Sequence, residues 1–280
     1  MKKIEILLAT FNGEKYLSEL LTSIAKQSYN NWILRVADDC STDNTLNILR
    51  RFKERFPERV NITINQFRLG AAENFLALMK NSKMDLVAFC DQDDVWMPNK
   101  LQKLYTELER KRHELSDPAL PILVYSDAIV VDSNLNTLEK SLISFHGNDN
   151  VYSHTYDRLK YRNSITGCTV LANLNAINAS VLCADNMYSE TKKRITMHDH
   201  WIGLIVSKNN GLILKIKDPL ILYRQHDNNV VGAVKSRLSL KLVTRKFRNI
   251  QKKYEMISFL DQDTRFISYI IKHILFKLRN

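Results

Sequence analysis

Three aspartates, Asp91, Asp93 and Asp94, lie within four positions directly after the apolar run 86–90. Carboxylates this close repel one another, so the cluster indicates a positively charged partner that offsets the repulsion. A hard divalent cation is the simplest such partner, because Mg²⁺ takes one or two carboxylates and fills its other positions with water and phosphate oxygens. The alternative is that Asp93 or Asp94 caps the helix expected near Pro98, while the other acids are solvated. The string alone leaves both interpretations open.

A second group that could do chemistry is the segment HDHW, residues 198–201. Its carboxylate, Asp199, stands at an expected helix start, where acids commonly cap the free N–H groups. His198 and His200 flank it, but adjacent residues on a helix point about 100° apart and seldom chelate one ion together. From the residues alone, helix capping is therefore the simpler role for Asp199.

The elements that must position these residues follow from the spacing of apolar side chains. Short apolar runs predict strands, and helical spacing predicts a helix after each of them: strands 4–10, 32–39, 61–66 and 85–90, helices 16–28, 41–55, 71–82 and 99–113. This alternation predicts an α/β fold with a mostly parallel sheet flanked by helices, which binds ligands beyond the carboxyl ends of its strands. One rim should therefore collect the polar residues that follow the strands: Thr10, Asn12, Asp38, Asp39, Arg68 and Asp91 to Asp94.

The second half of the chain has a looser pattern. The expected elements are a strand at 122–132, a strand or turn at 163–173, helices at 173–184 and 197–209, and two strands around a proline turn within 211–226. The remainder is predicted to be helical. We accordingly divide the chain into residues 1–115, residues 116–232 and a C-terminal helical extension, residues 233–280.

Several segments together resemble a known family. TFNGEKYLSELLTSIAKQSYNNWILRVADDCSTDNT, NQFRLGAAENF and DQDDVWMPNKL are similar to the nucleotide-sugar-binding half of family 2 glycosyltransferases, which have the GT-A fold. NSITGCTVLAN, HDHW and YRQHDNNVVG extend the resemblance to the bacterial rhamnosyltransferase-like branch, over about residues 3–232. The resemblance implies one Rossmann-like GT-A domain, in which 1–115 binds the nucleotide sugar and 116–232 binds the acceptor and carries the catalytic residue.

The resemblance implies a site for a nucleoside-diphosphate sugar, with dTDP or UDP as the nucleotide. The donor-binding residues that it implies are Thr10, Asn12, Glu14, Asp38, Asp39, Arg68, Asp91 and Gln92. Asp38 or Asp39 would accept a hydrogen bond from the base or the ribose, because N3–H of uracil or thymine is a donor. Both could instead cap the helix that follows. Arg68 would reach the diphosphate or remain a solvated base, and Asp91 would bind ribose or orient the loop.

The resemblance also implies a divalent metal ion, Mg²⁺ or Mn²⁺, at residues 91–93, which we call the D-x-D segment. Asp93 would hold the ion against the donor phosphates, and Asp94 is a further candidate ligand. His226 of YRQH would complete the metal or diphosphate site, or else serve as an ordinary core or surface histidine. The ion would neutralise the charge that grows on the diphosphate as the glycosidic bond breaks.

The remaining requirement is a base. A sugar hydroxyl is a poor nucleophile at neutral pH, so an inverting single displacement needs a carboxylate or imidazole within hydrogen-bond reach. The family places its aspartate base in the segment similar to HDHW, which makes Asp199 the expected catalytic residue. The acceptor-binding residues implied are Trp96, Gly167, Cys168, His198 and Trp201. The tryptophans would stack on sugar rings or belong to the core, and Gly167 would let the backbone approach the acceptor or pack a turn.

The expected activity is transfer of one sugar, with rhamnose favoured, to a glycan or lipid-linked acceptor in surface polysaccharide synthesis. YRQH replaces the Q-x-x-R-W motif of processive synthases, and no apolar run of about 18 residues is present. Two other classes stay open. One is a haloacid-dehalogenase-type phosphohydrolase, whose nucleophilic aspartate also follows an apolar strand. The other is a non-catalytic module that binds sugar nucleotides or membranes.

The C-terminal segment carries most of the positive charge. Residues 235–280 contain twelve Lys or Arg and three acids, which gives them +9 of the net +11 of the chain. Bases mixed with Leu, Phe, Ile and Tyr at helical spacing predict an interfacial helix on an anionic membrane surface. Packing on the body or a homo-oligomer is the alternative, and nucleic acid is not expected because no nucleic-acid motif is present. Since the four cysteines form no C-x-x-C pair, we expect a cytoplasmic location, peripheral at the inner face of the cell membrane.

Overall fold

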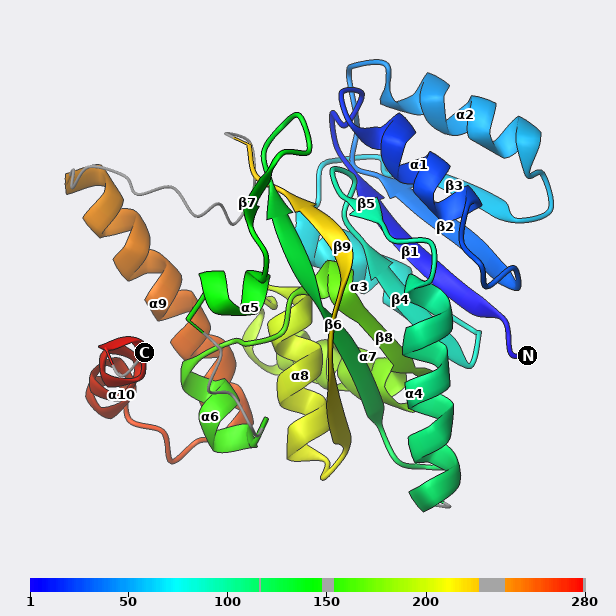
Figure 1. Cartoon of the computed structure of the whole chain (residues 1–280). Coiled ribbons are helices and arrows are strands. Elements are labelled where there is room, and N and C mark those ends of the chain that lie inside the picture. Colours follow the sequence, from blue (N-terminus) through cyan, green and yellow to red (C-terminus); the bar gives the residue numbers. More distant parts are fainter. Residues whose placement is uncertain (116, 148–153, 227–239, 279–280) are drawn as a thin grey trace.

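A computed structural model describes residues 1–115, 117–147, 154–226 and 240–278, which form one nine-stranded sheet flanked by helices (Figure 1). The strands are β1 (Ile4–Thr10), β2 (Trp32–Asp38), β3 (Val60–Ile64), β4 (Leu86–Cys90), β5 (Val95–Trp96), β6 (Ile122–Val131), β7 (Thr137–Glu139), β8 (Val170–Asn173) and β9 (Leu212–Arg224). The helices are α1 (Leu17–Ala25), α2 (Thr45–Arg55), α3 (Ala71–Lys80), α4 (Lys100–Leu115), α5 (Leu142–Phe145), α6 (Tyr156–Tyr161), α7 (Leu174–Thr191), α8 (His198–Lys208), α9 (Leu240–Leu260) and α10 (Phe266–Leu278), with a 3₁₀ turn, η1 (Gly167–Thr169). The strand order is β3-β2-β1-β4-β8-β6-β9-β5, and β7 pairs with β6.

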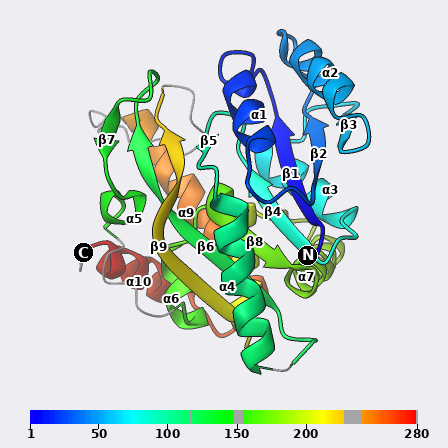
Figure 2. The ribbon, with the colours of Figure 1, turned by 45° about the vertical axis from the view of Figure 1, so that its right-hand side comes forward.

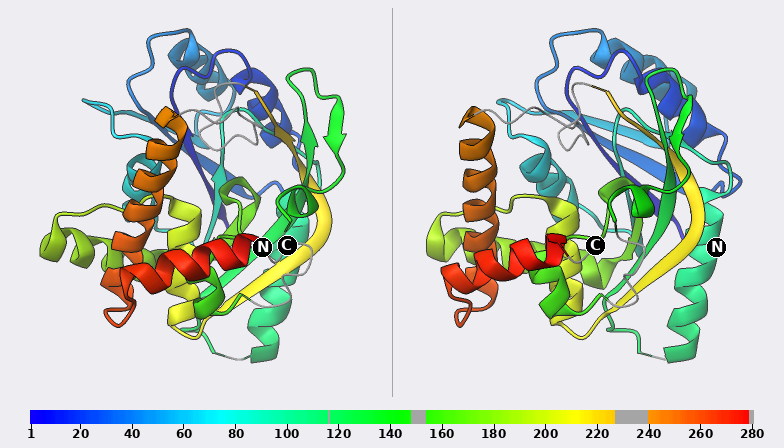
Figure 3. Two further views of the ribbon diagram at one scale, coloured as in Figure 1. Left: turned by 90° about the vertical axis from the view of Figure 1, so that its left-hand side faces the viewer. Right: turned by 60° about the vertical axis from the view of Figure 1, so that its left-hand side comes forward.

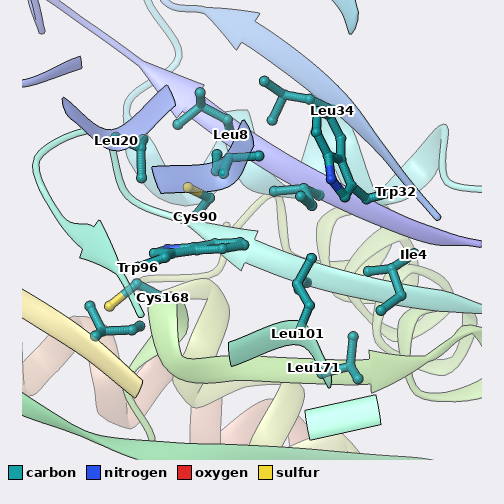
Figure 4. Close-up of a cluster of buried hydrophobic side chains, with 14 of the residues drawn as sticks. Ile4, Leu8, Leu20, Trp32, Leu34, Cys90, Trp96, Leu101, Cys168 and Leu171 are labelled. Atoms are coloured by element: carbon teal, nitrogen blue, oxygen red, sulfur yellow. The ribbon is translucent and has the colours of Figure 1, made fainter. Parts of the chain in front are cut away.

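The first half of the sheet is parallel, as the alternation of strands and helices predicted. β1 pairs in parallel with β2 and β4, and β2 pairs in parallel with β3. Side chains of a strand alternate between the two faces, so Ile4 and Leu8 enter one apolar core while Leu7 enters the other. Figure 4 shows part of the first core, where Leu8, Leu20 of α1 and Leu101 of α4 gather. Parallel pairing brings the carboxyl ends of β1, β2 and β4 to one edge.

The second half of the sheet is mixed. β8 lies antiparallel between β4 and β6, β5 and β7 are antiparallel to their neighbours, and β6 and β9 run parallel side by side (Figure 2). Antiparallel neighbours need no helical crossover, so the strict alternation of the first half ends here.

The two strands predicted within 211–226 are one continuous strand, β9, so that prediction was wrong. Pro219 lies opposite Asp127 at a point where the register between β6 and β9 shifts. A proline is accommodated at such an irregularity because it has no N–H to contribute to the ladder. Pairing with the long strand β6 on both sides of Pro219 keeps β9 continuous.

The C-terminal helices pack on the body of the protein (Figure 3). Met256, Ile257 and Leu260 of α9 are buried in the second core, and Tyr269 of α10 is buried as well. The packing alternative therefore holds for this part of the extension, whereas residues 227–239, which include its predicted start, lie outside the described residues. Within the described ranges, no helix is both long and apolar enough to cross a membrane.

Candidate active site

A cavity of about 1370 Å³ lies where β1, β2 and β4 end. The residues predicted from the sequence that line it are Thr10, Asn12, Asp39, Arg68, Asp91, Gln92, Asp93, Gly167, His198, Asp199 and His226. Those that do not are Glu14, Asp38, Asp94, Trp96, Cys168 and Trp201. Pockets for drug-sized ligands measure about 300–1000 Å³. This cavity therefore has room for a ligand the size of a nucleotide sugar and part of a second molecule.

The loop after β1 is fastened to the loop after β2 by Asp38. Its Oδ1 accepts hydrogen bonds from the hydroxyls of Thr10 (2.8 Å) and Ser41 (2.6 Å), and its Oδ2 accepts one from the N–H of Ser41 (2.8 Å). Asn12 adopts a left-handed conformation with φ of 47° at the turn beside it. Because Asp38 is fully buried, it joins the loops and cannot contact a base or ribose, so its predicted binding role is wrong.

Asp39 faces the cavity and shapes the loop after β3. Its Oδ1 accepts the N–H of Leu69 at 2.7 Å, and its Oδ2 accepts the N–H of Gly70 at 2.8 Å. Gly70 has φ of 83°, a conformation that favours glycine. This loop carries Arg68, whose guanidinium carbon lies 3.7 Å from the ring centroid of Phe11. Of the two aspartates after β2, Asp39 is thus the one placed to meet a ligand.

Gln92 fixes the D-x-D segment to the loop after β1. Its Oε1 accepts the N–H of Phe11 at 2.9 Å, and its Nε2 donates to the carbonyl of Phe11 at 3.0 Å. Gly13 passes so close that a Cβ there would lie 2.5 Å from this Oε1. The amide of Gln92 is therefore occupied by the protein, and its first role is to position the loop.

Asp93 and His226 meet inside the cavity, with 2.9 Å between Oδ2 of Asp93 and Nε2 of His226. Arg224, which is buried, brings the two segments together, because its Nε donates to the carbonyl of Asp93 at 2.8 Å. A carboxylate and an imidazole nitrogen at this spacing, with open space beside them for phosphate oxygens, form a donor set suited to a divalent cation. These residues fit the metal ion that the resemblance implies.

A second acidic group lies close to Asp93, whose charge acts on both of its carboxyls. Atoms of Asp91, Asp94 and Cys168 that could ligate a metal all lie within 4.8 Å of one another, and burial raises the pKa of both carboxyls. Lys100 is fully buried below them, where its Nζ donates to the carbonyl of Cys168 at 2.7 Å. Asp94 is 1% exposed, and its Oδ1 accepts the N–H of Arg224 at 3.1 Å. Asp94 therefore supports the loop from a buried position and does not line the cavity, while its predicted role as a metal ligand stays a prediction.

Asp199 lines the same cavity from the first turn of α8. Its Oδ2 accepts the N–H of Gly167 at 3.1 Å, and its Oδ1 accepts a hydrogen bond from Nδ2 of Asn163 at 3.2 Å. Burial raises the pKa of Asp199 to about 6, against the lowering effect of these hydrogen bonds. Its Oδ1 also accepts the N–H of His200 at 2.5 Å, so Asp199 satisfies one free N–H of the first turn of α8, although the N-cap position itself is Met197. A fixed carboxylate with this pKa is suited to accept a proton near neutral pH.

His198 and Gly167 are packed against each other beside Asp199. The His198 ring stacks on Phe75 with 3.9 Å between centroids, and burial lowers the pKa of His198 to about 3. A Cβ on Gly167 would lie 2.4 Å from Nε2 of His198. Glycine is therefore required at position 167 for η1 to approach α8. This close approach also brings the N–H of Gly167 to the carboxylate of Asp199.

Comparison with known proteins identifies the family of the chain. Residues 5–160, more than half of the chain, match the family model described as glycosyl transferase family 2. The dTDP-rhamnosyl transferase RfbG of Shigella flexneri is 30% identical over 236 residues, which are 81% of this chain and 74% of that protein. The chain belongs to glycosyltransferase family 2.

Other relatives of this family 2 glycosyltransferase match shorter parts or the fold. Escherichia coli WfgD, named as a UDP-Glc:alpha-D-GlcNAc-diphosphoundecaprenol beta-1,3-glucosyltransferase, is 37% identical over 101 residues, 35% of this chain and 38% of that protein. Staphylococcus aureus TarS 1–349 in complex with UDP-GlcNAc has a TM-score of 0.61 and 17% identity over 95% of this chain and 69% of that one. Mannosyltransferase PcManGT from Pyrobaculum calidifontis, in complex with GDP-Man and Mn²⁺, has a TM-score of 0.59 and 13% sequence identity, and the match covers 99% of this chain and 70% of that one. The predicted GT-A fold with C-terminal helices is confirmed.

Three predicted acceptor-binding residues of this glycosyltransferase belong to its core. Trp96 is 2% exposed, Trp201 is 0% exposed, and neither lines the cavity. The indole N–H of Trp201 donates to the carbonyl of Ser180 at 2.9 Å. Large rings gain most from burial, so the predicted stacking of these tryptophans on sugars is wrong. Cys168 is 1% exposed beside the buried acids and likewise cannot touch an acceptor.

Glu14 also lies outside the cavity, contrary to its predicted donor-binding role. Its carboxylate accepts the N–H of Asn44 at 2.9 Å, and its own N–H donates to Asp43 at 3.0 Å. Glu14 is exposed, and it ties the loop after β1 to the start of α2. Glu14 is only two residues from Asn12, which lines the cavity, but this closeness in sequence did not predict the direction of the Glu14 side chain.

The sequence patterns missed the part of the cavity that is built by distant segments. Four residues line this part of the cavity: Arg162 and Asn163, which follow α6, Lys253 of α9 and His273 of α10. The available signal was Lys253, a base within the apolar spacing of a predicted helix. Such a base is unremarkable until the packing of α9 shows that it points inward.

Proposed function

We propose that this family 2 enzyme is an inverting, non-processive glycosyltransferase that moves one sugar from a nucleoside diphosphate to a glycan or lipid-linked acceptor in surface polysaccharide synthesis. One observation carries the proposal: a single cavity is lined by Asp93 and His226, which fit a diphosphate-bound cation, and by Asp199, a fixed carboxylate with a raised pKa. Transfer needs both a place for the leaving group and a base for the attacking hydroxyl within one site.

A dTDP-linked rhamnose is the leading donor, because RfbG is named as a dTDP-rhamnosyl transferase and aligns with 81% of this chain. A UDP-linked sugar is the alternative, since TarS has been solved with UDP-GlcNAc and with UDP. The base and ribose would lie against Thr10, Asn12 and Asp39, whose carboxylate can accept N3–H of thymine or uracil. Arg68 would then reach toward the diphosphate.

Asp93 and His226 would hold Mg²⁺ or Mn²⁺ against the donor phosphates, with Asp91 beside them. An imidazole ligand suits Mn²⁺ better than Mg²⁺, and PcManGT has been solved with Mn²⁺. When bound, the ion supplies Lewis-acid neutralisation of the charge on the leaving diphosphate. Arg224 holds the D-x-D segment through the carbonyl of Asp93, and Lys100 lies close enough to Asp91 and Asp94 for their charges to raise its pKa against the effect of burial.

Asp199 would take the proton of the acceptor hydroxyl. The hydroxyl oxygen then forms a bond to the anomeric carbon while the bond from that carbon to the diphosphate breaks on the opposite face, which inverts the configuration. Hydrogen bonds from Gly167 and Asn163 orient the carboxylate before the acceptor arrives. The raised pKa lets Asp199 accept a proton without holding it at neutral pH.

A screen of nucleotide sugars with Mn²⁺, by calorimetry and product analysis with and without EDTA, tests this proposal. Transfer or donor hydrolysis that stops on addition of EDTA supports it. Hydrolysis of aryl phosphates would favour the phosphohydrolase, and donor binding without any turnover would leave a sugar-nucleotide-binding module.

We also propose that the enzyme is cytoplasmic and binds the inner face of the cell membrane through α10. Four apolar side chains of α10 form one exposed stripe at helical spacing: Ile267, Ile271, Ile274 and Leu275, which are 73%, 53%, 47% and 46% exposed. The net charge of +9 in residues 235–280 complements anionic lipid headgroups. An anionic bilayer is therefore the occupant that we propose for this stripe, and a second copy of the chain is the other outcome of its test.

A further inference from the structure

Lys253 breaks the apolar stripe by which α9 packs on the body. Met256, Ile257 and Leu260 are buried, and a helix places a residue three, four and seven positions earlier on the same side. That residue is Lys253, and it lines the cavity. Burial lowers the pKa of Lys253, so its charge is partly desolvated there. An apolar residue would pack more favourably at this position, which indicates that the charge has a use.

The described part of the chain places no ion-pair partner at the ammonium of Lys253. Among the residues that the structure describes, Lys253 forms no hydrogen bond and no ion pair, although the carboxylate of Asp199 is close enough to raise its pKa against the effect of burial. Its ammonium therefore faces the cavity with donors to spare. The carboxylate of Asp199 in turn accepts hydrogen bonds from Gly167, Asn163 and His200.

A second cation, Arg162, also lines the cavity, and its chain neighbour Asn163 donates to Asp199. Arg162 follows α6, and one guanidinium nitrogen donates to the carbonyl of Gly147 at 3.0 Å, which fixes the side chain. His273 of α10 points inward too, and its Nδ1 lies 2.7 Å from the carbonyl of Tyr161. The other acids of the lining, Asp39, Asp91, Asp93 and Asp132, follow strands β2, β4 and β6. These acids thus follow strand ends, whereas Arg162 and Lys253 come from helical segments that are each linked to Asp199, one through Asn163 and one through the charge of Asp199.

We infer that Arg162 and Lys253 form a subsite that binds a phosphate or diphosphate group of the acceptor. This inference rests on the proposed function, because it takes Asp199 as the position of the attacked hydroxyl. An anionic group held at Lys253 would place the sugar attached to it beside Asp199. Guanidinium and ammonium groups bind phosphate through charge-assisted hydrogen bonds, and the partial burial of Lys253 strengthens such bonds.

The test is calorimetric titration of the full chain, preloaded with dTDP and Mg²⁺ so that the donor end is filled. The probes are geranyl diphosphate, inorganic phosphate and uncharged geraniol. We expect geranyl diphosphate to bind, geraniol to fail, and Lys253→Met or Arg162→Gln to weaken diphosphate binding by about tenfold or more. Inorganic phosphate that competes with geranyl diphosphate would show that the phosphate alone is recognised.

Lys252→Met is the matched control, because Lys252 is the exposed neighbour of Lys253 on the same helix and should leave the affinity unchanged. Titration of dTDP into each variant separates the two proposals. Lost dTDP binding in the unmodified chain would contradict the donor site, whereas unchanged diphosphate affinity in Lys253→Met, or no binding of geranyl diphosphate by the unmodified chain, would overturn the subsite.

Discussion

The two ends of the cavity are built in different ways. At the end that we propose for the donor, Thr10, Asp39 and Asp91 each lie at or directly after the last residue of a parallel strand. At the end that we propose for the acceptor, Asp199 comes from the start of α8 and Lys253 from the middle of α9. The donor end depends on the edge of one sheet, whereas the acceptor end depends on how several helices pack.

The two constructions differ in how the positions of their residues are set. An edge made by strand ends and their loops is fixed by backbone pairing and presents ligand-binding groups at predictable positions. An end made by α8, α9 and η1 can be changed by altering helix packing while the donor end stays intact. We therefore expect variants at the two ends to separate acceptor effects from donor effects.

The largest effect is expected from Asp199→Asn. Removal of the base should lower the rate of transfer by about 10²- to 10⁴-fold, because the attacking hydroxyl loses its proton acceptor. The affinity for dTDP should stay unchanged, since Asp199 lies at the acceptor end. Initial rates and dTDP titration measure the two quantities, and Asp185→Asn, a change at a half-exposed acid, is the control. Retained transfer would remove Asp199 from the mechanism.

A loss at the donor end is expected from Asp93→Ala. His226 alone would hold the cation weakly, so transfer should fall by about 10²-fold and the response to Mn²⁺ should flatten. Mn²⁺ titration of donor binding measures this effect. Donor binding that keeps the Mn²⁺ dependence of the unmodified chain would contradict the assignment of Asp93.

Two glycine variants compare the ends directly. A Cβ on Gly167 meets Nε2 of His198 at 2.4 Å, and a Cβ on Gly13 meets Oε1 of Gln92 at 2.5 Å. Gly167→Ala should displace the N–H that holds Asp199 and lower kcat by about tenfold to 10²-fold. Gly13→Ala should instead raise the KM for the donor. If both variants changed the same kinetic constant, the proposed separation of the ends would fail.

The pH dependence should report Asp199. Burial raises its pKa to about 6, and the base must be ionised to act, so kcat should fall about tenfold per unit as the pH drops below about 6. The free energy of unfolding should depend on pH in the opposite direction to kcat. Ionising Asp199 in the folded protein costs free energy, so its contribution to stability decreases as the pH rises toward its folded pKa. Binding of dTDP over the same range controls for titration of the metal ligands, and a flat profile of kcat from pH 5 to 7 would contradict the assignment.

The sequence predicted that Thr10, Asn12, Asp39 and Asp91 gather at one edge of the sheet, which the structure shows, because strand ends are local features. It could not separate Asp38 from Asp39, since adjacent residues point to opposite sides and only the tertiary contacts decide which side faces the cavity. It likewise could not show that Asp94 turns down toward Arg224, or that Trp96 and Trp201 are core residues. Lys253 stayed hidden because its position depends on the docking of α9, a contact between segments far apart in the chain.

The smallest effect on catalysis is expected from α10. Ile267→Asn combined with Ile271→Asn should reduce flotation with anionic liposomes several-fold, because each exposed isoleucine would bury apolar area in the bilayer. Transfer to a soluble acceptor should be unchanged. Ser268→Asn, at an exposed position on the same helix, is the control. Unchanged flotation of the double variant would reject the membrane face, and a shift in oligomeric state would assign the stripe to a second copy of the chain.

The account depends most on one arrangement, in which a cation-bound diphosphate and the base share the cavity. A crystal structure with a dTDP- or UDP-sugar and Mn²⁺ tests this directly through the anomalous signal of manganese. We predict manganese at Asp93 and His226, with the anomeric carbon of the sugar facing Asp199. Manganese or donor bound elsewhere, or a sugar turned away from Asp199, would contradict the account.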